Sequence, residues 1–140
     1  MATEPDPHML RRAEPRAAKH GVGLRAAPAE RIPFPDASFD TVVSSGVFCS
    51  VDDPARAIAE VHRVLRPGGE LRFGEHVRAR RPARRLMQRV LDPLHHRMFR
   101  CHIGRDTLAL FRKAGFNIEE LDHPRYADVI GVARKSTEAH

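Results

Sequence analysis

Two regular patterns of apolar residues stand out near the middle of the chain. Residues 39–44 (FDTVVS) have β-branched residues at their centre, which is typical of a parallel strand covered on both faces. Residues 54–66 carry Ile58, Val61 and Leu65 at helical spacing and predict an amphipathic helix. We expect Asp53 to cap this helix and Pro54 to occupy its first position.

Weaker patterns predict further elements on both sides. Pro67-Gly68-Gly69 is expected to end the helix, and residues 70–75 (ELRFGE) to form the next strand. Pro93 is expected to kink or split a basic helix at 83–100. The remaining predictions are a helix at 8–19, a short strand at 22–27, a helix at 105–114, and two terminal strands at 116–121 and 128–134 that could pair antiparallel.

Alternating strands and helices predict the α/β class. We expect an open sheet, mostly parallel with an antiparallel C-terminal strand, and helices on both faces. Residues 1–135 are predicted to form the domain, and residues 136–140 a disordered tail. In such sheets the ligand lies beyond the carboxyl ends of the strands. This rule indicates three places: near Glu4, near Ala29-Glu30, and near Ser44-Ser45-Gly46.

Composition narrows the class of protein. A chain of 140 residues is at most one domain. Cys49 and Cys101 lie far apart and form no disulfide framework, which favours a reduced compartment. No apolar run approaches the roughly 20 residues that span a bilayer. The N-terminus has no apolar core typical of a signal peptide. We therefore expect a cytoplasmic protein without a membrane span.

The positive charge is concentrated in one segment. Arg78 to Arg105 contains nine arginines and one acid, whereas the whole chain has a net charge of +6. This segment could attract an anionic substrate, a nucleic acid or an acidic membrane surface. Phe99 is the one phenylalanine among the arginines, and no tyrosine or tryptophan interleaves with them as a base-stacking surface needs. A solvated helix face is the favoured interpretation, and nucleic-acid binding is not expected.

Three motifs at characteristic spacing carry a resemblance to a known family. They are IPFPDASFDTVV, SVDDPARAIAEVHRVLRPGGEL and GEHV, all between Ala29 and Val77. Together they resemble the class I S-adenosylmethionine-dependent methyltransferase domain, of the methyltransferase type 11 kind found in ubiquinone and menaquinone biosynthesis. The later segment RLMQRVLDPLHHRMFRCHIGRDTLALFRKAGF is similar to the thiol methyltransferase-like branch. The resemblance implies methyl transfer from S-adenosylmethionine to a small molecule, with an apolar thiol as the candidate acceptor.

The resemblance also implies a cofactor site, residue by residue. Glu4 stands where the family places a carboxylate that holds the two ribose hydroxyls of the cofactor. Ala29 and Glu30 match the pair that lies against the adenine. Ser44, Ser45 and Gly46 match the strand end that faces the methionine part. Each residue also has an ordinary structural explanation, since all of them could simply end strands or turns.

The same resemblance places the substrate wall at His76, Val77 and Cys101. A solvated loop histidine and a buried, inert cysteine are the competing explanations. No catalytic residue is predicted, because alignment of an activated sulfonium with the acceptor can suffice. His95, His96 and His102 lack standard ligand spacing, so no metal site is expected.

One departure from the family pattern limits the functional prediction. The family has a first strand followed by a glycine-rich cofactor loop before the second strand, and we identify no such loop between Met1 and Ala29. We therefore expect an N-terminally truncated domain without its first strand. The protein could begin further upstream, be a truncated relative, or form a homodimer that covers the gap. A non-catalytic binding or regulatory domain is the alternative function.

Overall fold

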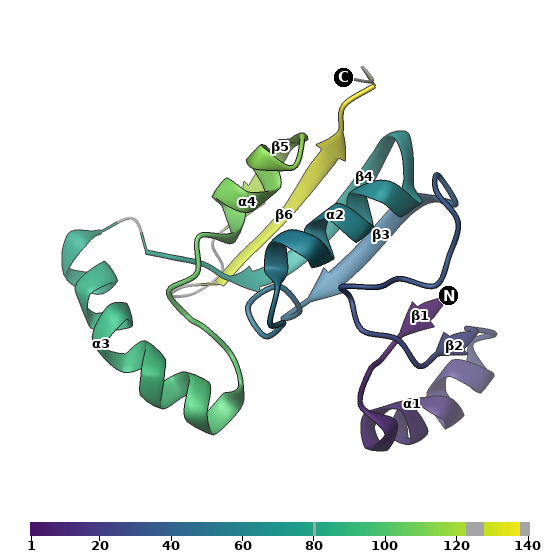
Figure 1. Cartoon of the computed structure of the whole chain (residues 1–140), viewed down its shortest axis with the longest axis horizontal. Coiled ribbons are helices and arrows are strands. Elements are labelled where there is room, and N and C mark those ends of the chain that lie inside the picture. The colour runs from purple at the N-terminus through teal and green to yellow at the C-terminus, as the bar shows by residue number, and fades with distance from the viewer. Residues whose placement is uncertain (80, 123–127, 138–140) are drawn as a thin grey trace.

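The central element of the computed structural model is a mixed four-stranded sheet, shown in Figure 1. The structure describes residues 1–79, 81–122 and 128–137. The strand order is β3 (Phe39–Ser45), β4 (Leu65–His76), β6 (Asp128–Lys135) and β5 (Phe116–Asp122). Strands β3 and β4 are parallel, whereas β6 is antiparallel to both β4 and β5. The predicted α/β class and the antiparallel C-terminal strands are confirmed.

A small second sheet lies beside the first. Strands β1 (Ala2–Thr3) and β2 (Leu24–Arg25) pair in parallel and are joined by helix α1 (Pro7–Lys19). The side chain of Asp6 caps α1 by accepting hydrogen bonds from two backbone amides of its first turn. In the described residues the two sheets are separate. A cavity of about 380 Å³ lies between them, lined by residues of β1, β3 and α2.

Helices α2 (Pro54–Val64) and α4 (Thr107–Lys113) cover one face of the four-stranded sheet (Figure 1). Asp53 caps α2 through the backbone amide of Arg56, and Pro54 occupies the first turn, as predicted. The core lies between these helices and the sheet. Its largest fully buried side chains are Phe48, Phe111, Phe116, Ile58, Leu65 and Leu71.

The opposite face of the four-stranded sheet is more open. The side chains of Val43 and Ile130, which lie on that face, are 74% and 55% exposed. The expected helical cover on both faces is therefore limited in the described residues to α2 and α4 on one side. Helix α3 (Pro82–Phe99) extends away from the sheet (Figure 1).

The structure corrects one prediction about α2 and narrows the two alternatives predicted for Pro93 in α3. Helix α2 ends at Val64, and β4 begins at Leu65, so the RPGG segment belongs to the strand rather than to a separate turn. The side chain of Lys135 donates to the carbonyls of His62 and Leu65, which satisfies backbone oxygens at this helix end. Helix α3 runs through Pro93 as one helix and is not split.

The remaining helices and strands agree with the sequence prediction within a few residues. The structure describes only part of the predicted tail, because residues 138–140 lie outside the described residues. Among the described helices, none combines the length and apolar character required to span a bilayer.

Candidate functional site

The carboxyl ends of β1, β2 and β3 border one cavity of about 730 Å³. Five of the six predicted cofactor residues line this cavity: Glu4, Ala29, Glu30, Ser45 and Gly46. They come from three segments that are separated by up to forty residues of sequence, so their convergence is a property of the fold. The other lining residues are Thr3, Pro5, Ala27, Pro28, Val47, Ser50, Val51, Asp52, Asp53, Arg56 and Arg100.

Glu4 is held in place at the first border of this cavity. Its backbone amide donates to the carbonyl of Arg25 at 3.1 Å, which extends the β1–β2 pairing by one residue. One carboxylate oxygen accepts a hydrogen bond from the amide of Asp6 at 2.9 Å. The carboxylate has two oxygens and about four acceptor sites, so it retains capacity for hydroxyl donors in the cavity.

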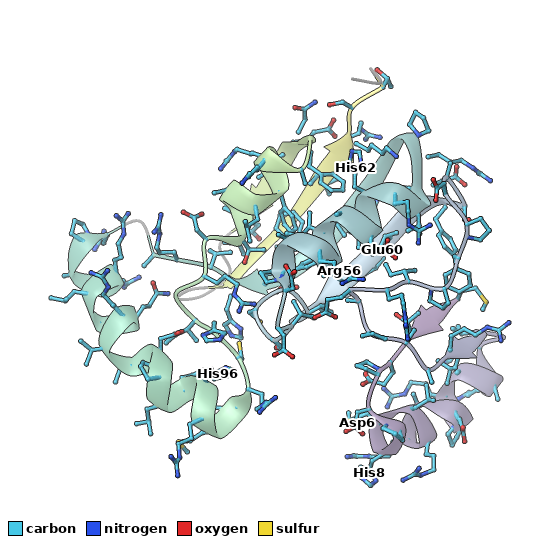
Figure 2. All side chains as sticks on the ribbon, viewed as in Figure 1. Asp6, His8, Arg56, Glu60, His62 and His96 are labelled. Atoms are coloured by element: carbon cyan, nitrogen blue, oxygen red, sulfur yellow. The ribbon has the colours of Figure 1, made fainter. Side chains whose placement is uncertain are left out.

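Glu30 joins the second border of the cavity to the start of α2. The guanidinium of Arg56 donates to the backbone carbonyl of Glu30 at 3.1 Å. A carboxylate oxygen of Glu30 lies 3.4 Å from the amide of Asp53, the cap of α2. Figure 2 shows Arg56 on α2. Four carboxylates, those of Glu4, Glu30, Asp52 and Asp53, line the cavity together with two arginines.

The loop between β3 and α2 forms the third border and is held by the side chains of Glu75 and Arg105. The Glu75 carboxylate accepts hydrogen bonds from the amides of Val47 at 2.9 Å and Cys49 at 3.1 Å. The guanidinium of Arg105 donates to the carbonyls of Phe48 and Val51 at 2.7 and 2.8 Å. Since Val47 and Val51 line the cavity, Glu75 and Arg105 fix part of its wall.

Sequence reasoning assigned no role to Glu75 or Arg105. Glu75 is 3% exposed at the end of a strand whose preceding inward residues, Leu71 and Phe73, are apolar. Burial raises the pKa of its carboxyl, although backbone hydrogen bonds oppose this effect. An acid on the apolar side of a predicted strand was a signal for such a role. Arg105 carried no comparable signal, because it was one of nine arginines in its segment.

Ser44 is the predicted cofactor residue that does not line this cavity. It lines the cavity between the two sheets instead. Its hydroxyl is buried and has no hydrogen-bond partner in the described part of the chain. The alternation of side chains along β3 explains the difference, since Ser44 and Ser45 point to opposite faces of the sheet.

The predicted substrate residues are divided between two environments. Val77 belongs to the hydrophobic core. His76 and Cys101 meet each other, with the thiol sulfur of Cys101 3.4 Å from His76 Nδ1. Cys49, for which no role was predicted, joins them at 3.7 Å from the same nitrogen. The structure therefore brings two predicted substrate residues together and leaves the third in the core.

Comparison with protein families gives a match over the N-terminal half. The model of the family described as "Methyltransferase domain" matches residues 1–73. Thiol S-methyltransferase TMT1B from Rattus norvegicus is 43% identical over 89 residues, which cover 62% of this chain and 36% of that protein. The human thiol S-methyltransferase TMT1A is 41% identical over 90 residues, covering 63% of this chain and 37% of that protein. The chain thus spans little more than a third of these relatives.

Solved structures show the same fold. A SAM-dependent methyltransferase from Methanosarcina mazei superposes with a TM-score of 0.74 at 21% identity, covering 97% of this chain and 81% of that one. The [4+2]-cyclase SpnF superposes with a TM-score of 0.75 at 20% identity, covering 97% and 65% of the two chains. Since one of these proteins is named as a cyclase, the shared fold does not specify the reaction.

Proposed function

This chain belongs to the methyltransferase domain family of class I S-adenosylmethionine-dependent methyltransferases, and we propose that it acts in methyl transfer from this cofactor to a small-molecule acceptor. One observation carries the proposal. Five residues predicted to bind the cofactor, from the ends of three strands, line a single cavity. Beyond the strand ends is where open α/β sheets bind their ligands.

The chemistry of the cavity fits the cofactor. S-adenosylmethionine carries a positively charged sulfonium, an ammonium group and two ribose hydroxyls, all of which favour anionic or acceptor groups nearby. The cavity offers four carboxylates. In this assignment Glu4 accepts the ribose hydroxyls, and Ala29 and Glu30 lie along the adenine. Ser45 and Gly46 border the methionine part, with no side chain at Gly46 to obstruct it.

The backbone at Gly46 supports this role. Its φ angle is +63°, in the left-handed region that glycine adopts at little cost. Apart from its own chain neighbours, no atom lies within 4 Å of the position that a β-carbon would occupy there, so the residue leaves open space beside the cavity. A side chain at this position would be strained and would reduce the space available to a ligand.

A thiol is the acceptor that the relatives favour. The two relatives with 43% and 41% identity are both named thiol S-methyltransferases. In such a reaction the acceptor sulfur forms a bond to the methyl carbon, the bond from that carbon to the sulfonium breaks, and solvent takes the thiol proton. A strong protein base is unnecessary once the acceptor and the methyl group are aligned. Acceptor alignment is therefore the main task left to the chain's own residues.

Calorimetric titration of the purified chain with S-adenosylmethionine tests the cofactor site. We expect binding in the micromolar range, and a roughly tenfold loss in Glu4→Gln because charge-assisted hydrogen bonds are weakened. Glu14→Gln is the matched control, since Glu14 lies on α1 and does not line the cavity. Equal affinities of the two variants would contradict the role of Glu4.

The acceptor is tested on the same samples. A small apolar thiol and a hydroquinone of similar size are incubated with the cofactor, and methylated products are measured by mass spectrometry. The proposal expects the thioether as the main product. Binding of the cofactor without any methylated product would favour another acceptor class. A folded chain that fails to bind the cofactor would instead support the alternative of a non-catalytic binding or regulatory domain.

A further inference from the structure

Two cysteines and one histidine converge from three separate segments. Cys49 lies in the loop after β3, His76 ends β4, and Cys101 follows α3. Their ligand atoms all lie within 4.8 Å of one another, and we call these three residues the Cys–His–Cys cluster. His76 Nδ1 lies 3.7 Å from the sulfur of Cys49 and 3.4 Å from that of Cys101. This is an arrangement of three donor atoms around one point.

The spacing matches that of ligands around a tetrahedral zinc ion. Zinc bonds of about 2.3 Å to sulfur and about 2.0–2.1 Å to imidazole nitrogen place a sulfur and a nitrogen ligand about 3.6 Å apart. The two sulfur-to-nitrogen distances in the cluster, 3.7 and 3.4 Å, lie on either side of this value. Small side-chain adjustments would therefore be enough to place all three atoms at bonding distance from one ion.

The backbone around the cluster is fixed by hydrogen bonds. The amide of His102 donates to the carbonyl of Cys49 at 2.8 Å, which joins the two cysteine-bearing segments directly. The amide of Cys49 is held by the Glu75 carboxylate at 3.1 Å. Nδ1 of His95 lies 2.8 Å from the carbonyl oxygen of Cys101. These bonds fix the backbone positions from which the two cysteine side chains project.

Burial gives the cluster a protected environment. Cys49 is 1% and Cys101 7% exposed. Burial, assisted by the hydrogen bond with Cys101, raises the pKa of the Cys49 thiol to about 12. Without a cation the thiol therefore stays protonated, which argues against a reactive nucleophile. A divalent cation would compensate the charge of the two thiolates.

We propose that the Cys–His–Cys cluster binds one zinc ion through Sγ of Cys49, Sγ of Cys101 and Nδ1 of His76. Among the described residues, no fourth histidine, cysteine or carboxylate belongs to the same group. The fourth position is then left to water or to an external ligand, as in zinc sites with three protein ligands. The site does not depend on the methyl-transfer proposal, because none of its ligands lines the predicted cofactor cavity.

Metal binding by the full chain tests this proposal. The reduced, metal-free protein is titrated with zinc chloride against a chromophoric chelator, and separately with cobalt(II). We expect one equivalent of zinc to bind with a Kd of about 1 µM or tighter, and cobalt to give thiolate-to-metal charge-transfer absorption. Cys49→Ser, Cys101→Ser and His76→Ala are each expected to weaken zinc binding at least about a hundredfold, since loss of a secondary contact alone costs 10–100-fold.

The controls separate the proposal from its competitors. His20→Ala removes an exposed histidine outside the cluster and is expected to leave zinc affinity unchanged. Circular dichroism checks that each variant folds, and the cobalt spectrum of the unmodified protein gives a readout that needs no variant. Absence of thiolate charge-transfer absorption, or unchanged affinity in folded Cys101→Ser, would overturn the proposal. So would a stable Cys49–Cys101 disulfide that persists with zinc and reductant present.

Discussion

At the scale of single residues, Glu75 gives a prediction about pH. Burial raises the pKa of its carboxyl above 4.5 in the folded chain. The folded state therefore holds this proton more tightly than the unfolded state. The corresponding stabilisation is complete below pH 4.5 and is lost as pH rises through the raised folded pKa. Glu75→Gln has no titrating group and lacks this dependence.

Denaturant unfolding of both proteins across this pH range measures the effect. As pH rises from below 4.5 towards neutrality, the free energy of unfolding of the native chain should fall relative to that of Glu75→Gln. A second effect is separate from pH. The amide nitrogen of glutamine would face a backbone N–H, which costs about 1–3 kcal/mol. A difference that does not vary with pH would contradict the raised pKa.

The residues that sequence reasoning found and missed differ in one physical respect. The residues that sequence reasoning found lie at or just beyond strand ends, which local patterns and the family motifs both indicate. They are Glu4, Ala29, Glu30, Ser45 and Gly46. Cys49 and Arg105 act through partners about 25 to 60 residues away, such as His76 for Cys49 and Phe48 for Arg105. No feature of the sequence around either residue specifies such a partner. The prediction that no metal site is present used sequence spacing alone.

At the scale of secondary structure, α2 and α3 have similar patterns but different surroundings. Both carry apolar residues at helical spacing. In α2, Ile58 is fully buried in the core, whereas in α3 the side chain of Leu86 is 64% exposed. Periodicity predicts which side of a helix is apolar, but it does not predict whether another element covers that side.

Matched alanine substitutions test this difference. Ile58→Ala should lower the free energy of unfolding by about 2–5 kcal/mol, because it removes buried methyl groups and leaves a cavity. Leu86→Ala should change it by less than about 0.5 kcal/mol, as is usual for exposed positions. Denaturant unfolding measures both values. A comparable loss in the two variants would show that the apolar side of α3 is covered in solution.

Element boundaries show where local signals fail. The proline and glycines after α2 predicted a turn and then a strand, but β4 begins at Leu65 and pairs there with Phe39. The contacts from Lys135 to the end of α2 come from the last strand of the chain. These long-range contacts lie at the end of the helix and have no local sequence signal, so local sequence places that boundary only approximately.

At the scale of the whole molecule, local patterns predicted the order of strands and helices along the chain. They did not predict that the strands divide into two sheets. The alternation of strand and helix patterns predicted the α/β class, and the two C-terminal strand patterns predicted an antiparallel pair. Which strands pair depends on which strand edges come together in the folded chain. The α1 unit, made of β1, α1 and β2, and the four-stranded sheet border a common cavity but share no strand pairing in the described residues.

This division has a consequence for hydrogen exchange. Two units joined by few contacts should open independently, so amides of α1 should exchange faster than those of β4 and α2. S-adenosylmethionine would touch Glu4 in one unit and Ser45 and Gly46 in the other, and its binding energy would then oppose separation of the units. Exchange followed by mass spectrometry should show new protection in α1 when the cofactor is added. Equal exchange in both units, unaffected by the cofactor, would mean that they already open together. In the expected case, the ligand itself makes the two parts a single cooperative unit.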